Sequence, residues 1–328
     1  MRHLTLTAAA LTLGAAPGLA FPEKDLQGII QWGAGGSTDT VMRAVTPAAE
    51  EVLGADVVMT NRTGGVGAIA TKFVMAQDPD GHTLLMGAEN PQLYKVMGLG
   101  DVDYSDFVPI NVLARGVPIL VANTDAPFDT YEEMVEHVQA NPGDVRVGST
   151  GPGGLPSVVT AMLQSQDELP MTAVPYDGDG PALTALMGGA VDVYPAVLGA
   201  AIEGIEAGRM KPIAVVGTEL NPLLPDVPPI TEARPELAEF LPWGPFFGVF
   251  VAEGTPEEAV GALRDAYGRA AETEEFTTFM EDRGYELMNI TGEEAQEFLD
   301  RWQSVTSWLL HDAGATQASP EEFGIPRP

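Results

Sequence analysis

Short apolar runs alternate with longer stretches whose apolar residues recur at helical spacing along most of this chain. The runs predict strands at 28–32, 57–61, 83–86, 108–114, 119–122, 145–149, 173–176, 191–194, 213–217 and 247–252. The stretches between them predict helices at 39–53, 131–140, 156–165, 181–188 and 196–207, and the segment 256–313 predicts helices only. Because strands and helices alternate, we predict an α/β fold with parallel sheets covered by helices on both faces.

Two apolar segments far apart in the chain indicate how the protein divides. The chain has 328 residues, which is more than one hydrophobic core usually holds. The first segment, 111–122, is interrupted at 116–118, and the second is 245–252. We expect one to cross from a first lobe to a second and the other to return. This predicts lobe 1 at 21–120 plus 248–328, lobe 2 at 121–247, two strand crossovers as a hinge, and a cleft between the lobes.

The first 20 residues have the composition of an export signal. Arg2 and His3 are basic, residues 4–16 are mostly apolar, and residues 18–20 offer a cleavage site. The alternative, an uncleaved membrane anchor, needs an apolar stretch of about 20 residues, which is longer than this one. The chain has no cysteine, and this excludes disulfides, thiolate metal sites and a lipid-anchored N-terminal cysteine. We predict cleavage near Ala20 and a periplasmic protein.

The charge balance restricts the partners. Lys and Arg number 16 against 47 Asp and Glu, which gives a formal net charge of −31. Nucleic acid and anionic membrane surfaces are therefore excluded as partners, because both need clustered basic residues. A small anion can still bind where main-chain dipoles outweigh the general field, which salt screens over about 10 Å.

A glycine-rich turn at 33–39 offers such a place. It follows the predicted strand 28–32 and precedes the predicted helix 39–53. Glycines let several main-chain N–H groups point the same way, and Ser37 is predicted to cap the helix. The N–H groups of a first helical turn have no partner within the helix and attract anions without a basic side chain. The turn is therefore a candidate anion site.

Two further turns have the same context. The turns at 149–154 and 175–180 each follow a predicted strand and precede a predicted helix. In open α/β sheets binding sites collect at the carboxyl ends of strands, so the three turns can converge. Trp32, directly before the first turn, is the candidate wall of the cleft. The candidate ligand contacts are Trp32, Gly35, Gly36, Ser37, Thr38, Asp39, Ser149, Thr150, Gly151, Gly153, Gly154, Tyr176 and Gly178.

The chain offers little for catalysis. No Gly-x-Ser-x-Gly motif is present, and no histidine pair has metal-ligand spacing. A dinucleotide fingerprint needs Gly at 38, where this chain has Thr38. We therefore predict no catalytic residue, no metal and no cofactor. The alternative is an exported carboxylate-processing enzyme, a hydrolase or isomerase, using Asp39 or Asp192 with His82.

Several motifs resemble, in order and spacing, the substrate-binding proteins of tripartite tricarboxylate transporters, the TctC or Bug family. The resemblance extends from about 21 to 313. The motifs that carry it lie at 35–39 (Gly-Gly-Ser-Thr-Asp), 61–67 (Asn-Arg-Thr-Gly-Gly-Val-Gly), 78–85 (Asp-Pro-Asp-Gly-His-Thr-Leu-Leu), 174–176, 181–183, 188–193 and 224–228.

The resemblance implies a two-lobed periplasmic binding protein of the type II-like class, without enzymatic activity and expected as a monomer. In the family the loops that match 35–39 and 149–154 grip a carboxylate. The implied role is to capture an organic carboxylate and to deliver it to the membrane subunits of a transporter. Dicarboxylates, tricarboxylates and aromatic carboxylates stay open as ligands. The alternative role is a ligand-sensing module that signals to a receptor.

The chain departs from the family pattern in three places. Gln31-Trp32-Gly33 replaces the usual Pro-Phe-Pro, and Asp177 stands where the family often has a basic residue. Glu89 is unusual at a cleft that should attract an anion. One interpretation, which we favour from the sequence, is that Glu89 and Asp177 face solvent and match the acidic surface. The other is that they meet a positive group on a zwitterionic ligand.

Overall fold

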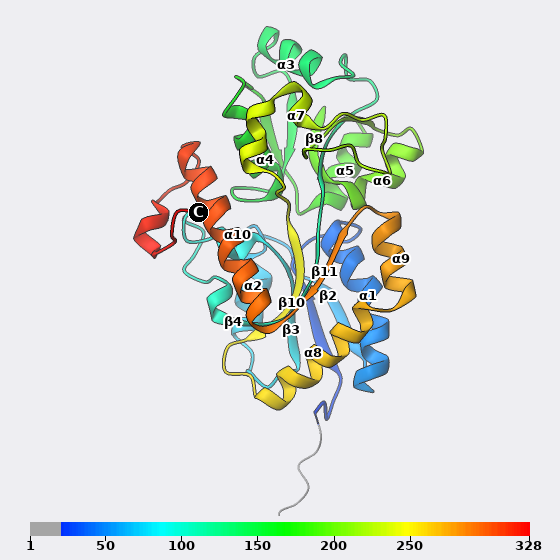
Figure 1. The fold of residues 1–328 in the computed structure, drawn as a ribbon, viewed down its shortest axis with the longest axis vertical. Helices are drawn as coiled ribbons and strands as arrows, with labels where there is room; N and C mark the ends of the chain where they lie inside the picture. The colour runs from blue at the N-terminus through cyan, green and yellow to red at the C-terminus, as the bar shows by residue number, and fades with distance from the viewer. Residues whose placement is uncertain (1–20) are drawn as a thin grey trace, which may run out of the picture.

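The protein folds into two lobes, each built on its own sheet (Figure 1). The computed structural model describes residues 21–328, so the predicted export signal, with its cleavage site at Ala20, lies outside the described residues. Two sheets with helices on both faces confirm the predicted two-lobed α/β fold. In the described part of the chain no helix is both long enough and apolar enough to cross a bilayer.

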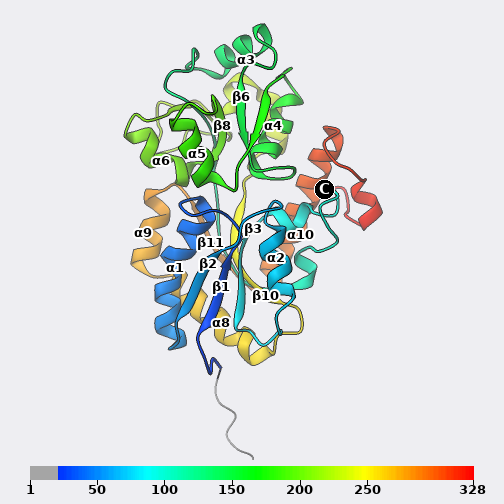
Figure 2. The same ribbon diagram turned by 180° about the vertical axis from the view of Figure 1, so that it is seen from behind.

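Lobe 1 contains the larger sheet, in the strand order β11-β4-β10-β3-β1-β2. Its strands are β1 (Leu26–Ile30), β2 (Val57–Asn61), β3 (Thr83–Ala88), β4 (Phe107–Arg115), β10 (Phe246–Ala252) and β11 (Glu286–Ile290). Helices α1 (Ser37–Leu53) and α8 (Glu257–Ala271) pack together on one face, and α9 (Glu274–Asp282) adjoins them. The other face carries α2 (Ala68–Met75) and α10 (Gly292–Asp312), as Figure 2 shows from behind.

Lobe 2 contains the smaller sheet, in the order β7-β6-β8-β5-β9. Its strands are β5 (Pro118–Ala122), β6 (Arg146–Ser149), β7 (Thr172–Pro175), β8 (Val193–Val197) and β9 (Lys211–Val215). Its helices are α3 (Tyr131–Ala140), α4 (Leu155–Gln164), α5 (Asp179–Met187), α6 (Leu198–Glu206) and α7 (Ile230–Ala233). Short 3₁₀ segments complete the chain: η1 (Asn90–Leu93), η2 (Tyr104–Asp106), η3 (Pro235–Phe240) and η4 (Pro320–Phe323).

Both sheets are mixed, and here the prediction of parallel sheets was wrong. β10 runs antiparallel to β3 and β4, and β5 runs antiparallel to β8 and β9. In lobe 1 the cause is the connection between the lobes. β4 carries the chain toward lobe 2, and β10 carries it back. Because these two neighbouring strands run in opposite directions, they pair antiparallel. The pairing leaves the carboxyl ends of β1, β3, β6 and β8 at the cleft.

The chain crosses between the sheets twice. It leaves lobe 1 after Arg115 and enters the second sheet at Pro118, and it re-enters the first sheet at Phe246. These crossings lie within a few residues of the proposed divisions at 120 and 248. The main-chain N–H of Gly116 donates to the carbonyl of Pro245 at 2.8 Å, which joins the two connections side by side. Two adjoining connections are the arrangement about which two-lobed proteins commonly open and close.

Strand β11 corrects the prediction that 256–313 holds helices only. It pairs with the outer edge of β4 in an irregular register, Glu286 opposite Arg115 and Ile290 opposite Val112. Asn289 within it has a positive φ of 50°. The strand is short, pairs with one neighbour only and contains a bulge, so it needs no regular alternation of apolar and polar residues. The helical patterns on either side therefore obscure it in the sequence.

Candidate functional site

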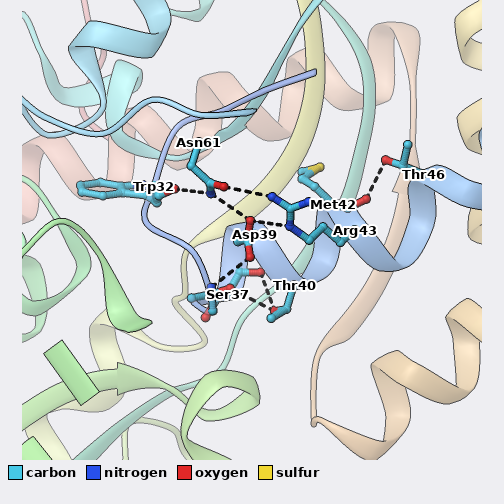
Figure 3. A network of polar contacts seen from close by, with 10 residues as sticks. Trp32, Ser37, Asp39, Thr40, Met42, Arg43, Thr46 and Asn61 are labelled. Atoms are coloured by element: carbon cyan, nitrogen blue, oxygen red, sulfur yellow. Dashed lines mark hydrogen bonds and ion pairs between the residues drawn. The ribbon is translucent and has the colours of Figure 1, made fainter. Parts of the chain in front are cut away.

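Asp39 organises the first glycine-rich turn from within lobe 1 (Figure 3). Its Oδ2 accepts the main-chain N–H of Gly35 at 3.0 Å, and its Oδ1 accepts Arg43 Nε and Asn61 Nδ2, both at 2.8 Å. The side chain is buried. Gly35 has a φ of 75°, the left-handed conformation that favours glycine. Asp39 thus shapes the turn and does not line the cavity described below.

Trp32 is held in place from two sides. Asn61 Nδ2 donates to the main-chain carbonyl of Trp32 at 2.8 Å, as Figure 3 shows, and the indole Nε1 donates to Asn90 Oδ1 at 3.0 Å. Asn61 ends β2, and Asn90 begins η1 directly after β3, so neighbouring strands fix both partners. The ring is therefore fixed where it lines the cavity described below.

Helix α1 begins differently from the prediction. Its N-cap residue is Gly36, in an extended conformation and without a side-chain cap, and Ser37 is the first helical residue. The Ser37 hydroxyl donates instead to Asp179 Oδ2 of lobe 2 at 2.7 Å. Gly36 has no side chain to cap the helix, so the Asp179 carboxylate meets the positive end at Ser37, and the following N–H groups of the first turn stay available to an acceptor from outside.

The cavity between the lobes has walls from both. Of the predicted contacts, Trp32, Gly36, Ser37, Thr38, Thr150 and Gly178 line it. Its other lining residues include Ala88, Glu89, Leu155, Asp179 and Phe247. The cavity measures about 30 Å³, a little more than the roughly 10–15 Å³ that one water molecule needs. The lobes are therefore nearly closed upon each other.

The remaining predicted contacts lie around the cavity. Gly35 and Tyr176 line a separate, shallower opening beside it. Asp39, Ser149, Gly151, Gly153 and Gly154 do not line the cavity. Ser149 Oγ accepts the N–H of Gly151 at 3.1 Å, and Gly154 is the N-cap of α4. These residues shape the second turn, with Gly151 and Gly153 at φ values of 96° and 74°.

Three helices begin at this cavity. Gly36, Ser37 and Thr38 start α1, Leu155 starts α4, and Asp179 starts α5. Each helix has at least nine residues, so each presents the positive end of its dipole. Thr38 and Thr150 line the same cavity, and each carries a hydroxyl. The arrangement offers hydrogen-bond donors from both lobes.

The third turn locks the lobes together. The main-chain N–H of Gly33 donates to the carbonyl of Asp177 at 2.9 Å. A Cβ placed on Gly180 would lie 2.4 Å from the carbonyl oxygen of Ala34 and 3.0 Å from the nitrogen of Gly36. The lobes approach this closely only because Gly180 has no side chain. Asp177 itself is exposed, in agreement with the interpretation favoured for it.

Glu89 was wrongly predicted to face solvent. It follows β3, it is only 4% exposed, and it lines the cavity. Burial, with a smaller contribution from nearby Asp179, raises the pKa of Glu89 to about 8. Burial also raises the pKa of Asp179, although hydrogen bonds from Tyr194 and Ser37 oppose the shift. Sequence reasoning assigned no role to Asp179; its place at a helix start, directly after Gly178 in the third turn, was the available signal.

No lysine, arginine or histidine lines the cavity among the described residues. Three nearby arginines already face acids: Arg43 pairs with Asp39, Arg115 with Glu286 and Arg146 with Asp192. Arg62, directly after β2, instead lies over the ring of Phe73. The described residues also include no group of three His, Cys, Asp or Glu side chains that could hold a metal. Any solute in this cavity therefore meets dipoles, hydroxyls and two acids.

The catalytic alternative does not assemble in this structure. Asp192 is bound to Arg146, and Asp39 to Arg43 and Asn61. His82 is buried beside Phe21, with Asp80 and Glu23 as its nearest acids. None of Asp39, Asp192 and His82 lines the cavity. The residues suggested for acid and base therefore share no site.

The sequence and the fold both match known proteins of one family. The profile described as "Tripartite tricarboxylate transporter family receptor" (TctC) matches residues 41–308. Protein BugT of Bordetella pertussis is 26% identical over 294 residues, which cover 87% of this chain and 89% of the relative. The periplasmic binding protein BugD matches with a TM-score of 0.84 and 25% identity, over 90% of this chain and 99% of BugD.

A second solved structure, MatC of Rhodopseudomonas palustris with bound malate, matches with a TM-score of 0.80 and 28% identity. The match covers 87% of this chain and 100% of MatC. The predicted resemblance and the absence of enzymatic activity are both confirmed by these matches. The chain belongs to the TctC family of periplasmic solute receptors, which bind solutes and do not transform them.

Proposed function

We propose that this protein captures an organic carboxylate in the periplasm and delivers it to the membrane subunits of a tripartite transporter. The observation that carries the proposal is the convergence of three helix starts on one cavity without a basic side chain. Malate bound to MatC, a relative with the same fold, supports a carboxylate as the ligand class. By this proposal, export removes residues 1–20 and the mature protein acts as a monomer.

The carboxylate contacts come from both lobes. N–H groups at the start of α1 and the Thr38 hydroxyl act from lobe 1, and the start of α4 and the Thr150 hydroxyl act from lobe 2. A hydrogen bond to a charged group contributes roughly 1.5–3 kcal/mol. Because only the closed form presents both sets at once, the bound solute stabilises closure.

The hinge must open and close for this to work. Ligand cavities usually measure about 300–1,000 Å³, and the closed cleft holds about 30 Å³. A solute of malate's size therefore enters a more open form, and the lobes then close around it. We assign the moving bodies to 21–120 plus 248–328 and to 121–247.

A pair of alanine variants tests the closure. Gly180→Ala adds a methyl group that meets lobe 1 only when the cleft is closed, whereas Gly188→Ala, at the other end of α5, meets nothing closer than 3.4 Å. Calorimetry with malate and a panel of other organic acids measures affinity. We expect Gly180→Ala to lose at least tenfold in affinity and Gly188→Ala to bind as the unaltered protein does. Equal affinities, or a ligand recovered as a chemically different product, would contradict the proposal.

Delivery is tested separately. In cells, uptake of the labelled ligand should require both this protein and the membrane subunits, and uptake should fall with Gly180→Ala but not with Gly188→Ala. Uptake that persists without this protein would contradict delivery while leaving ligand capture in place.

A further inference from the structure

Two acids face one another across the cavity. Glu89 comes from the end of β3 in lobe 1, and Asp179 from the start of α5 in lobe 2. Glu89 is 4% exposed, and the charge of Asp179 adds to its burial in disfavouring ionisation of Glu89. No basic side chain among the residues that line the cavity compensates for them. A cavity that held only an anion would gain nothing from this arrangement.

The two acids differ in what they already bind. Asp179 Oδ1 accepts the Tyr194 hydroxyl at 2.6 Å, and its Oδ2 accepts the Ser37 hydroxyl at 2.7 Å. Both oxygens therefore act as acceptors, as a carboxylate requires. Glu89 has, beyond its own main-chain amide, one long hydrogen bond of 3.4 Å from Asn90 Nδ2. A buried acid with so little compensation is costly unless a ligand supplies a donor.

We propose that the solute carries an ammonium group as well as a carboxylate, and that Glu89, assisted by Asp179, receives the ammonium group. The inference rests on the proposed function, because the carboxylate end stays with Thr38, Thr150 and the starts of α1 and α4. An ammonium group offers three donors and one positive charge. It pairs with the ionised Glu89 in a site from which water is excluded, where an opposite charge matters most.

A dicarboxylate of the same length would place a negative charge where the ammonium group is expected. Its second carboxylate would lie beside Glu89 and Asp179, so binding would need a proton on at least one acid. The other ionisable groups that interact with Glu89 or Asp179 are buried phenols whose pKa values burial raises above the ordinary 10, those of Tyr94, Tyr104, Tyr194 and Tyr285. They stay neutral between pH 6 and pH 8, so the two acids alone respond there.

Matched pairs of probes separate the two cases. Glutarate and 4-aminobutyrate share one carboxylate and three methylenes, and they differ only in the second charged group; succinate and 3-aminopropanoate form a shorter pair. Titration calorimetry at pH 7 should show at least tenfold tighter binding of the amino acid in the pair that fits. Between pH 6 and pH 8 its affinity should hold or rise, and the affinity of the dicarboxylate should fall.

One variant tests the role of Glu89 directly. Glu89→Gln keeps the shape of the side chain and one oxygen acceptor but removes the negative charge. We expect it to bind the amino acid at least tenfold more weakly and the dicarboxylate no more weakly. Glu258→Gln removes the same charge from an exposed position in α8 and should change neither affinity.

The possible outcomes are distinct. If the dicarboxylate binds at least as tightly as its amino acid partner, the ammonium inference is overturned and the proposed function stands. The inference is likewise overturned if Glu89→Gln leaves amino acid binding unchanged. If no probe of either kind, malate included, binds at millimolar concentration, the proposed function fails and the inference fails with it.

Discussion

Ser37 of lobe 1 donates its hydroxyl to Asp179 Oδ2 of lobe 2 at 2.7 Å, so an acid of the protein itself approaches the positive end of α1. This bond forms only when the cleft is closed. Its donor is a predicted ligand contact and its acceptor begins α5, so the same groups serve closure and the site. A carboxylate bound at the start of α1 must share or displace this hydrogen bond, so the bond should differ between the empty and the ligand-bound protein.

Ser37→Ala should loosen the closed form. The variant removes one charge-assisted bond between the lobes, so we expect the protein without ligand to be more open and the free energy of unfolding to fall by about 1–2 kcal/mol. Small-angle scattering measures the opening, and urea titration measures the stability. Ser157→Ala, at the start of α4, is the matched control because the Ser157 hydroxyl does not line the cavity. An unchanged scattering profile for Ser37→Ala would show that the pair does not hold the cleft.

Asp39→Ala should disturb the first turn without removing a group that touches the ligand. Arg43, Asn61 and Gly35 N would all lose their acceptor. We expect a loss of about 2–3 kcal/mol in the free energy of unfolding, in the range for hydrogen bonds to charged groups. Ligand affinity should fall as well, because the turn carries Gly36 and Thr38. A variant that binds normally despite the loss of stability would argue against the role of the turn.

Burial of Glu89 predicts a pH dependence of stability. Its pKa rises from an ordinary 4.5 to about 8 on folding, so the folded protein holds this proton more tightly than the unfolded chain. The stabilisation is complete below about pH 4.5 and is lost as the pH rises through 8. Compared with the unaltered protein, Glu89→Gln should therefore gain relative stability between pH 5 and pH 8.5.

The expected gain is more than about 1.4 kcal/mol, the value of one pKa unit. Urea unfolding of both proteins at the two pH values measures it. Opening of the lobes can hydrate Glu89, so the measurement should also be made on a protein whose lobes are cross-linked shut. A stability difference that stays constant from pH 5 to pH 8.5 in the cross-linked form would contradict the burial of an ionisable Glu89.

Trp32 should report binding. It lines the cavity, whereas Trp243 and Trp302 pack near each other outside it and Trp308 contacts the C-terminal segment. A bound solute should therefore change the intrinsic fluorescence, and Trp32→Phe should abolish most of that change. Trp308→Phe is the control and should keep it. A fluorescence change that survives Trp32→Phe in full would place the solute elsewhere.

Local patterns were sufficient to predict most of the elements. The strand at Val57–Asn61 and the helix at Tyr131–Ala140 were predicted with their observed bounds, because turn residues and a capping threonine delimit them. Thr130 caps that helix by accepting the N–H of Glu133. The glycine-rich turns were also placed correctly relative to strands and helices, since they depend on short-range backbone constraints.

Features that depend on the meeting of the two lobes could not be predicted. Whether Glu89 is exposed is decided by contacts with a lobe that begins some thirty residues later, and its neighbour Asp179 lies still further along the chain. The partner of Ser37 and the antiparallel course of β10 have the same origin. No local pattern of apolar and polar residues records which surfaces face each other across a cleft.

The crystal structure of the protein in complex with its tightest-binding carboxylate tests the central claim most directly. We predict that the carboxylate oxygens lie about 3 Å from the hydroxyls of Thr38 and Thr150 and from N–H groups at the starts of α1 and α4. A carboxylate held instead by an arginine or lysine side chain, or bound outside the cleft between the lobes, would contradict the account.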